Sequence, residues 1–244
     1  MGAGGQSLAA LIEEAYEVFK RPRPTDLGVC DCCMDPKIMD RFLDWPVRQI
    51  PVGDLRDWYF GAADLKGMPQ ATLRWLAPRI LELFAKGEDI ASVGPEVVLQ
   101  RFAYAGFPDA WTRAEVDVVE RYATEFLRCF LAYPAFRARC EGDLDTYLCA
   151  LMASGIRANG LIEVLDTAQT ADIVAATGEM HQLFWDAFWE HSPARRQLQS
   201  WYLSEAFLDR LMRFADCETA PEALRHGALK IGDNILEWRD MGYR

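Results

Sequence analysis

Residues 112–132 read TRAEVDVVERYATEFLRCFLA, and this stretch decides the fold class. Thr112 and Glu115 stand three positions apart, the spacing of a capping box, in which each side chain satisfies a free backbone N–H of the first helical turn. Apolar side chains then recur every three or four positions: Val116, Val119, Ala123, Phe126 and Phe130. The stretch therefore predicts a long amphipathic helix with its own N-terminal cap.

The same period recurs on both sides of this stretch. Ser7 and Asp35-Pro36 are start signals for two earlier helices, because such polar side chains cap a first turn and proline fits its first position. A stripe from Leu73 to Phe84 predicts another helix, and Pro78 inside it either kinks that helix or marks its first turn. We expect further helices over about 8–20, 36–44, 95–105, 135–153, 158–168, 170–190, 193–214 and 221–239, and one from Asp54 to a break at Gly67.

Alternation of apolar and polar residues between turn dipeptides is not found, so we predict little or no sheet. Val29 and the segment from Val47 to Val52 are the only candidates for a short strand. We therefore expect an all-α protein of about nine to ten helices. A chain of 244 residues fits one compact helical domain over residues 1–244. The alternative is two subdomains that divide near residues 133–134 or in the turn around 87–95.

The chain is acidic along its whole length. Its 37 Asp and Glu residues outnumber 26 Lys and Arg residues, which gives a net charge of −11, and neither half holds most of the excess. An acidic surface repels phosphate backbones and attracts basic partners. The charge therefore argues against nucleic acid as a ligand and favours a basic protein partner.

Targeting features are not found in the sequence. No stretch approaches the roughly 18–20 uncharged apolar residues of a membrane helix. The first seven residues, MGAGGQS, lack the basic and apolar regions of a secretory signal. Seven cysteines, an odd number, suit free thiols in a reducing compartment better than a disulfide framework. We therefore expect a cytoplasmic protein that does not enter a membrane.

Cys30, Cys32 and Cys33 form a dense group of reactive side chains. One interpretation is a zinc site, because zinc prefers four tetrahedral thiolate or imidazole ligands. A second is a redox thiol, since a predicted helix start lies just after Cys33 and its dipole would lower a thiol pKa. A third is free thiols packed in a loop. All three stay open, no cofactor other than zinc is expected, and the candidates for a fourth zinc ligand are His181, His191, His226 and the other cysteines.

The aromatic residues gather in a few short stretches. Trp58 and Tyr59 fall in one expected helix, and Trp185 and Trp189 share a face of another with His181. Tryptophan and tyrosine are frequent anchors of protein interfaces. Trp58, Tyr59, Trp185 and Trp189 are therefore predicted to contact a protein partner. The alternative is that they fill the core, as most aromatic stripes do.

Carboxylate pairs are the remaining candidates for chemistry: Glu13 with Glu17, Asp143 with Asp145, and Asp233 with Glu237. Carboxylates four positions apart share a helix face, as a general acid and base would. An acidic surface produces such spacings freely, so solvated side chains are the alternative. No glycine-rich phosphate loop and no Gly-x-Ser-x-Gly elbow accompanies them.

Four motifs in the first half occur in a fixed order: CDCCMDP at 30–36, YFGAA at 59–63, LAPRILEL at 76–83 and WTRAE at 111–115. Together they resemble a family of helical bacterial proteins with a C-x-C-C-M-x-P start and an L-x-P-R-x-L-E-L motif. The resemblance spans about residues 8–130 and implies an all-helical fold. It implies no activity, so no site residue is carried over from it.

Three functions are compatible with these observations. The first is a non-catalytic binding protein, by analogy with small acidic helical proteins that act as immunity-type inhibitors of bacterial toxins. The second is a zinc-binding or thiol-based protein centred on the cysteines at 30–33. The third is an enzyme with a carboxylate-lined helical pocket. The acidity and the many aromatic residues favour the first, whose partner would be a basic toxin domain.

Overall fold

The computed structural model describes residues 6–25, 27–29, 36–61, 69–184, 187–192 and 194–243. These residues form helices and no strand, which confirms the all-α prediction. The α-helices are α1 (Leu8–Val18), α2 (Pro36–Asp44), α3 (Val52–Gly61), α4 (Gln70–Ala85), α5 (Pro95–Tyr104), α6 (Arg113–Ala132), α7 (Pro134–Arg137), α8 (Leu144–Ala153), α9 (Ala158–Thr167), α10 (Thr170–Ala176), α11 (Arg195–Tyr202), α12 (Glu205–Ala215) and α13 (Glu222–Asp240). Two short 3-10 helices are η1 (Val47–Gln49) and η2 (Ala187–His191).

The described chain has thirteen α-helices, more than the nine to ten that we expected. Two expected helices are each divided in two by an N-terminal cap that begins a second helix. One becomes α7 and α8, because Gly142 adopts a φ of +124° and the Asp143 side chain accepts the Thr146 N–H at 3.1 Å. The other becomes α11 and α12, because the Ser204 side chain accepts the Phe207 N–H at 3.2 Å. Each cap begins a new helix.

The helix expected over residues 170–190 is wrong beyond Ala176, where α10 ends. Phe184 lies at a φ of +66°, which a helix does not allow. The buried Asp145 carboxylate of α8 accepts hydrogen bonds from the Phe184 N–H and from the Trp189 indole N–H, the latter at 2.8 Å. These tertiary bonds hold a turn followed by η2 in place of a continuous helix.

Three further expectations can be compared with this architecture. The segment from Val47 to Val52 forms η1 and the first residue of α3, and Val29 lies in no strand. Pro78 lies in the interior of α4 and not in its first turn. Among the helices of the described chain, none combines the length and the apolar composition that a membrane crossing needs.

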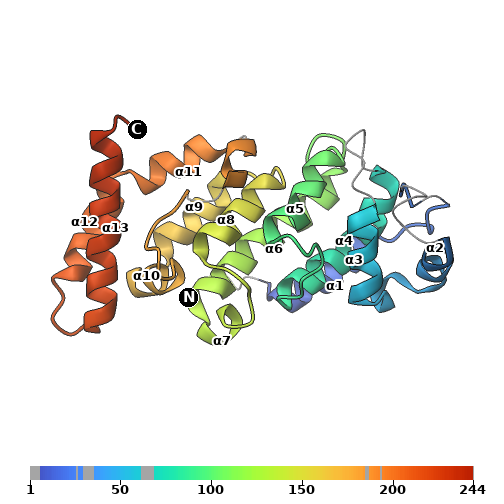
Figure 1. Ribbon diagram of the computed structural model, residues 1–244, viewed down its shortest axis with the longest axis horizontal. Coiled ribbons are helices and arrows are strands. Elements are labelled where there is room, and N and C mark those ends of the chain that lie inside the picture. Colours follow the sequence, from blue (N-terminus) through green and yellow to red (C-terminus); the bar gives the residue numbers. More distant parts are fainter. Residues whose placement is uncertain are drawn as a thin grey trace.

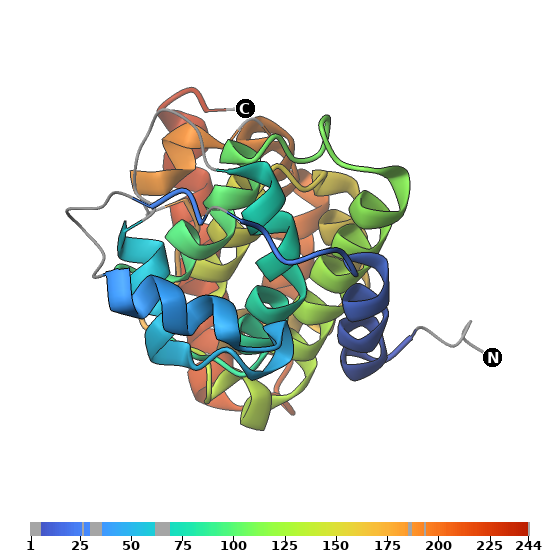
Figure 2. The same ribbon diagram turned by 90° about the vertical axis from the view of Figure 1, so that its right-hand side faces the viewer.

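The helix α6 is central to the arrangement. In Figure 1 the elements run from α2 and α3 at one end of the long axis to the hairpin of α12 and α13 at the other. The helices α1 and α9 pack against α6, which also contacts α7 and α8. Figure 2 shows α1 on the outside of the bundle, where it covers one flank of α6.

Aromatic rings fill the space under the apolar face of α6. Phe126 is fully buried, and its ring centroid lies 5.0 Å from that of Phe84 on α4 and 5.3 Å from that of Tyr147 on α8. Phe130 lies 4.9 Å from Tyr147. Aromatic pairs of this kind add about 0.5–1.5 kcal/mol each beyond the area they bury. The apolar face of α6 is therefore anchored in the core.

Glu115 fixes the beginning of α6. The capping box is confirmed: the Glu115 carboxylate accepts the Thr112 N–H at 2.8 Å, and the Thr112 hydroxyl accepts the Glu115 N–H. Arg21, which follows α1, and Arg74 of α4 both donate to the same carboxylate. Glu115 is only 2% exposed. One buried carboxylate therefore joins three segments that are far apart in the sequence.

Candidate functional site

The cysteines Cys30, Cys32 and Cys33 lie outside the described residues, so their zinc, redox and free-thiol interpretations stay predictions. Within the part of the chain that the structure describes, no group of three Cys, His, Asp or Glu side chains could hold a metal ion. Elemental analysis of the untagged protein, beside a triple Cys→Ser variant, tests the zinc interpretation. Zinc content and stability that the substitutions leave unchanged would refute it.

Three of the four aromatics predicted to contact a partner lie in the core. Trp58 and Trp189 are 0% exposed, and Tyr59 is 1% exposed. The Trp58 indole N–H and the Tyr59 hydroxyl donate to backbone carbonyls at 2.9 and 3.1 Å. Side chains without exposed surface contact no partner, so core packing replaces the predicted interface at these three positions. Trp185 lies outside the described residues.

The carboxylate pairs have separate structural surroundings. Glu13 accepts hydrogen bonds from Arg48, and Glu17 lies 3.6 Å from Lys20. The pair at 143 and 145 caps α8 and holds the η2 segment, and the pair at 233 and 237 is exposed on α13. The interpretation of these pairs as an acid and a base therefore gains no geometric support, and the enzyme alternative stays a prediction.

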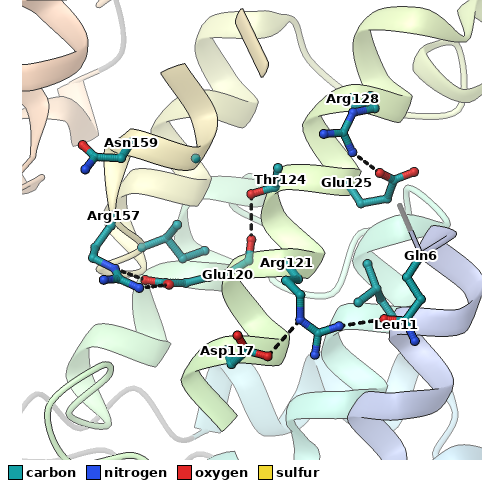
Figure 3. A pocket seen from close by; sticks show the side chains of 12 residues that line it. Gln6, Leu11, Asp117, Glu120, Arg121, Thr124, Glu125, Arg128, Arg157 and Asn159 are labelled. Atoms are coloured by element: carbon teal, nitrogen blue, oxygen red, sulfur yellow. Dashed lines mark hydrogen bonds and ion pairs between the residues drawn. The ribbon is translucent and has the colours of Figure 1, made fainter. Parts of the chain in front are cut away.

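A groove of about 500 Å³ runs along the open face of α6, between α1 and the beginning of α9 (Figure 3). We call it the α6 groove. Its polar lining comes mainly from α6 itself, because the charged residues of this helix lie opposite the apolar face. The charged side chains in it are Asp117, Glu120, Arg121, Glu125, Arg128 and Arg157.

Arg121 joins α6 to α1 across the floor of the groove. Its Nε donates to Asp117 Oδ2 at 2.9 Å, and its Nη1 donates to Gln6 Oε1 at 2.7 Å and to Glu14 Oε2 at 3.0 Å. Nη2 also donates to Glu14, so the guanidinium is held as a fork in a fixed plane. Hydrogen bonding to Glu14 raises the pKa of Arg121, and the same bonds lower the pKa of Glu14. Both groups are therefore charged at neutral pH.

Two more arginine–carboxylate pairs frame the groove. Arg157, the residue before α9, donates through Nε to Glu120 Oε1 at 2.6 Å and through Nη2 to the other oxygen. Arg128 donates to Glu125 one turn earlier on α6. The arginine side chains are 73% and 51% exposed, whereas those of Glu120 and Glu125 are 19% and 17% exposed. The arginines therefore reach outward, and the carboxylates lie closer to the floor.

The helices α6 and α9 approach closely at one point of the groove. A Cβ added to Gly160 would lie 2.9 Å from Thr124 Oγ1. That hydroxyl donates to the Glu120 carbonyl at 2.9 Å. Because glycine has no side chain, the two backbones come close enough for Arg157 to reach Glu120.

The α6 groove adjoins a smaller hollow of about 230 Å³ at the C-terminal end of α6, and Arg128 lines both. The apolar residues of the smaller hollow are Leu131, Ala132, Val164 and Ala168. Charged and apolar surface therefore follow one another along the same helix.

Sequence reasoning missed this groove. Asp117 with Arg121, and Glu125 with Arg128, show opposite charges at the spacing of any solvated helix face. Glu14 and Glu120 pair with arginines that lie 107 and 37 residues away in the sequence. Local spacing therefore marks α6 as an exposed helix but cannot identify the two helices that enclose its open face.

Comparisons with known proteins found no match: no protein family, no curated protein and no solved structure matches the chain. The interpretation of the α6 groove rests on its own geometry. That geometry offers a line of fixed charges beside an apolar hollow.

Proposed function

We propose that the chain is a binding protein for a basic polypeptide and that the α6 groove is its contact site. The observation that carries the proposal is the row of carboxylates along the groove, Asp117, Glu120 and Glu125. Each carboxylate has about four acceptor positions, and one arginine uses only one or two of them. Lysine and arginine side chains of a partner would donate to the remaining positions.

The charge of the whole chain supports a basic partner. A net charge of −11 attracts a basic protein from a distance and speeds encounter. The specific form that we propose is an immunity-type inhibitor, a cytoplasmic protein that covers a basic toxin domain. The attraction between the acidic chain and its basic partner should weaken as salt is added, because at 0.1 M salt the ions screen charges that lie more than about 10 Å apart.

The shape of the site supports a polypeptide over a small molecule. Small-molecule sites are concave and enclose roughly 70–90% of their ligand. From Asp117 to Ala132, α6 offers a line of about 22 Å, which matches a partner helix of about four turns. The adjoining apolar hollow would receive one apolar side chain of that helix.

A phosphate or carboxylate ligand fits the site less well. Three arginines line the α6 groove, but Arg121, Arg128 and Arg157 each already bond to a carboxylate. A small anion would therefore approach the carboxylates as closely as the guanidinium groups, and like charges repel. A basic polypeptide meets the opposite situation, because its cations approach carboxylates whose acceptor positions are only partly used.

The experiment is affinity capture from an extract of the native host, at low and at moderate salt. The bait is the wild-type chain or a charge-reversed groove variant that carries Glu120→Lys and Glu125→Lys. We expect the wild type to retain a basic protein, with less retained at higher salt, and the groove variant to lose it.

The matched control carries the same charge change at two exposed glutamates outside the groove, Glu179→Lys and Glu218→Lys. It should retain the partner nearly as well as the wild type, and circular dichroism should show all three baits folded. Retention of no basic protein at either salt would refute the proposal. Equal retention by the groove variant and the control would refute the site.

A further inference from the structure

The helix α13 carries a second open surface of different character. Arg225, Leu229, Leu236 and Asp240 follow one another at steps of four, seven and four residues, so they lie along one flank of the helix. Leu229 and Leu236 are 40% and 47% exposed. We call these four residues the α13 stripe.

A methionine from the neighbouring helix completes the apolar part of the stripe. A Cβ added to Gly232 would lie 3.4 Å from Met212 Sδ, so Met212 of α12 lies against the glycine between the two leucines. Met212 is itself 39% exposed. Single exposed apolar side chains are common on proteins, but a contiguous patch of them marks a contact surface.

The stripe lies apart from the core side of α13. The buried residues of α13 are Gly227, Ala228, Ile231, Gly232 and Ile235, and Gly232 lies beneath Met212 and Leu208 of α12. Figure 1 shows the α12–α13 hairpin at one end of the long axis, with the other helices on one side of it only. A partner could therefore reach the stripe without disturbing the core.

The order of residues along the stripe is self-complementary. Leu229 and Leu236 are equally far from the midpoint between Gly232 and Asp233, and so are Arg225 and Asp240. When a second α13 lies antiparallel across that midpoint, each Leu229 meets the Leu236 of the other copy. Each Arg225 then meets the Asp240 of the other copy, so the charges at both ends are opposite.

We propose that the α13 stripe is the contact surface of a two-fold homodimer in which two α12–α13 hairpins form a four-helix arrangement. A two-fold contact uses the same patch on both copies and so requires a self-complementary surface. The charge order supplies this property. A partner of another kind would need the apolar patch only, and the opposite charges at equal distances from the midpoint would have no role.

Sedimentation equilibrium over a range of protein concentrations tests the proposal with the full chain. We expect the wild type to pass from monomer to dimer and to form nothing larger. A variant with Leu229→Ser and Leu236→Ser should stay monomeric at concentrations where the wild type is dimeric. The control, Val93→Ser, removes another exposed apolar side chain and should dimerise like the wild type.

A charge exchange tests the antiparallel register. Arg225→Asp and Asp240→Arg alone should each weaken the dimer about 10-fold or more, because each places two pairs of like charges together. The double variant should recover to within about threefold of the wild type. The two residues are about 22 Å apart on one helix, so this recovery can come only from pairing between copies.

Asp233 provides a second readout of the register. It lies next to the midpoint, so the two-fold contact brings two like charges together, and Asp233→Asn should strengthen the dimer about threefold. A single monomeric species at every concentration would overturn the proposal. Dimers that the leucine substitutions leave intact, failure of the double variant to recover, or open-ended assemblies would overturn it as well.

Discussion

The helices α6 and α13 are alike in length and period and differ in what surrounds them. They are 20 and 19 residues long, and each has one apolar face that packs inside the molecule. The helices α1 and α9 enclose the open face of α6, which is charged and paired, whereas the open flank of α13 keeps two exposed leucines. The comparison shows that helical period predicts the buried face, and that neighbouring helices decide what the other face can bind.

The largest expected difference between the two helices is the cost of shortening an apolar side chain. Phe126→Ala on α6 removes a fully buried ring and should lower the free energy of unfolding by about 3–5 kcal/mol. Leu236→Ala on α13 should change it by no more than about 0.5 kcal/mol in dilute, monomeric protein, because nearly half of that side chain is exposed. Urea denaturation measures both, and similar costs would contradict the comparison.

The next effect concerns the charge that anchors the beginning of α6. Glu115→Gln keeps a side chain that can complete the capping box but removes the charge that Arg21 and Arg74 share. We expect a loss of about 2–3 kcal/mol, below the value for fully buried pairs because both arginines are partly exposed. Thermal unfolding of the variant, beside Glu237→Gln on the exposed face of α13 as control, measures it. Equal melting temperatures for the two variants would show that Glu115 has no anchoring role.

Acid should affect the surroundings of α6 through another carboxylate, Glu82 of α4. Burial opposes its ionisation, but hydrogen bonds from Lys86, Tyr16 and Arg79 outweigh burial and lower its pKa to about 2. Because the folded pKa lies below the ordinary value of 4.5, this contribution is complete above that value and is lost as the pH falls toward about 2. We expect the wild type to lose about 1–2 kcal/mol more than Glu82→Gln between neutral pH and about pH 3, after allowance for solvent screening. Denaturation curves at the two pH values measure this, and equal losses would refute it.

The smallest effect compares two glycines. Gly160→Ala places a Cβ 2.9 Å from Thr124 Oγ1 and should cost about 1 kcal/mol. Gly232→Ala meets nothing closer than 3.4 Å, so the gain in helix propensity should stabilise α13 by about 0.5–1 kcal/mol. Opposite signs in chemical denaturation would support the close packing of α9 on α6. If both substitutions stabilised the protein, α9 would not be packed closely against α6 at Gly160.

Local signals were sufficient for α6, whose cap and apolar period lie close together in the sequence, but the equally local caps at Asp143 and Ser204 were not predicted. The pair Thr112 and Glu115 predicted the beginning of α6 correctly, and the apolar period after it predicted the buried face. The helix expected over 170–190 failed for the opposite reason. Asp145, from another helix, accepts hydrogen bonds from Phe184 and Trp189. The residue spacing within 170–190 cannot predict this contact.

The same limit explains why the candidate site in the structure differs from the sites predicted from the sequence. Trp58 and Tyr59 were singled out for their chemistry, and the structure buries both. The α6 groove depends on which distant helices flank α6, and on contacts such as that between Arg121 and Glu14. Residue chemistry can be read from one sequence, whereas the meeting of two helices far apart in the chain cannot.

Glu115 has a consequence for synthesis on the ribosome. Arg21 is made 94 residues before the carboxylate that it contacts in the folded protein. At translation rates of about 5–20 residues per second, this interval lasts about 5–19 seconds. During that time the nascent α1 has neither Glu115 nor α6 to dock against, so its apolar residues Leu8, Leu11 and Ala15 are available to chaperones before they are buried.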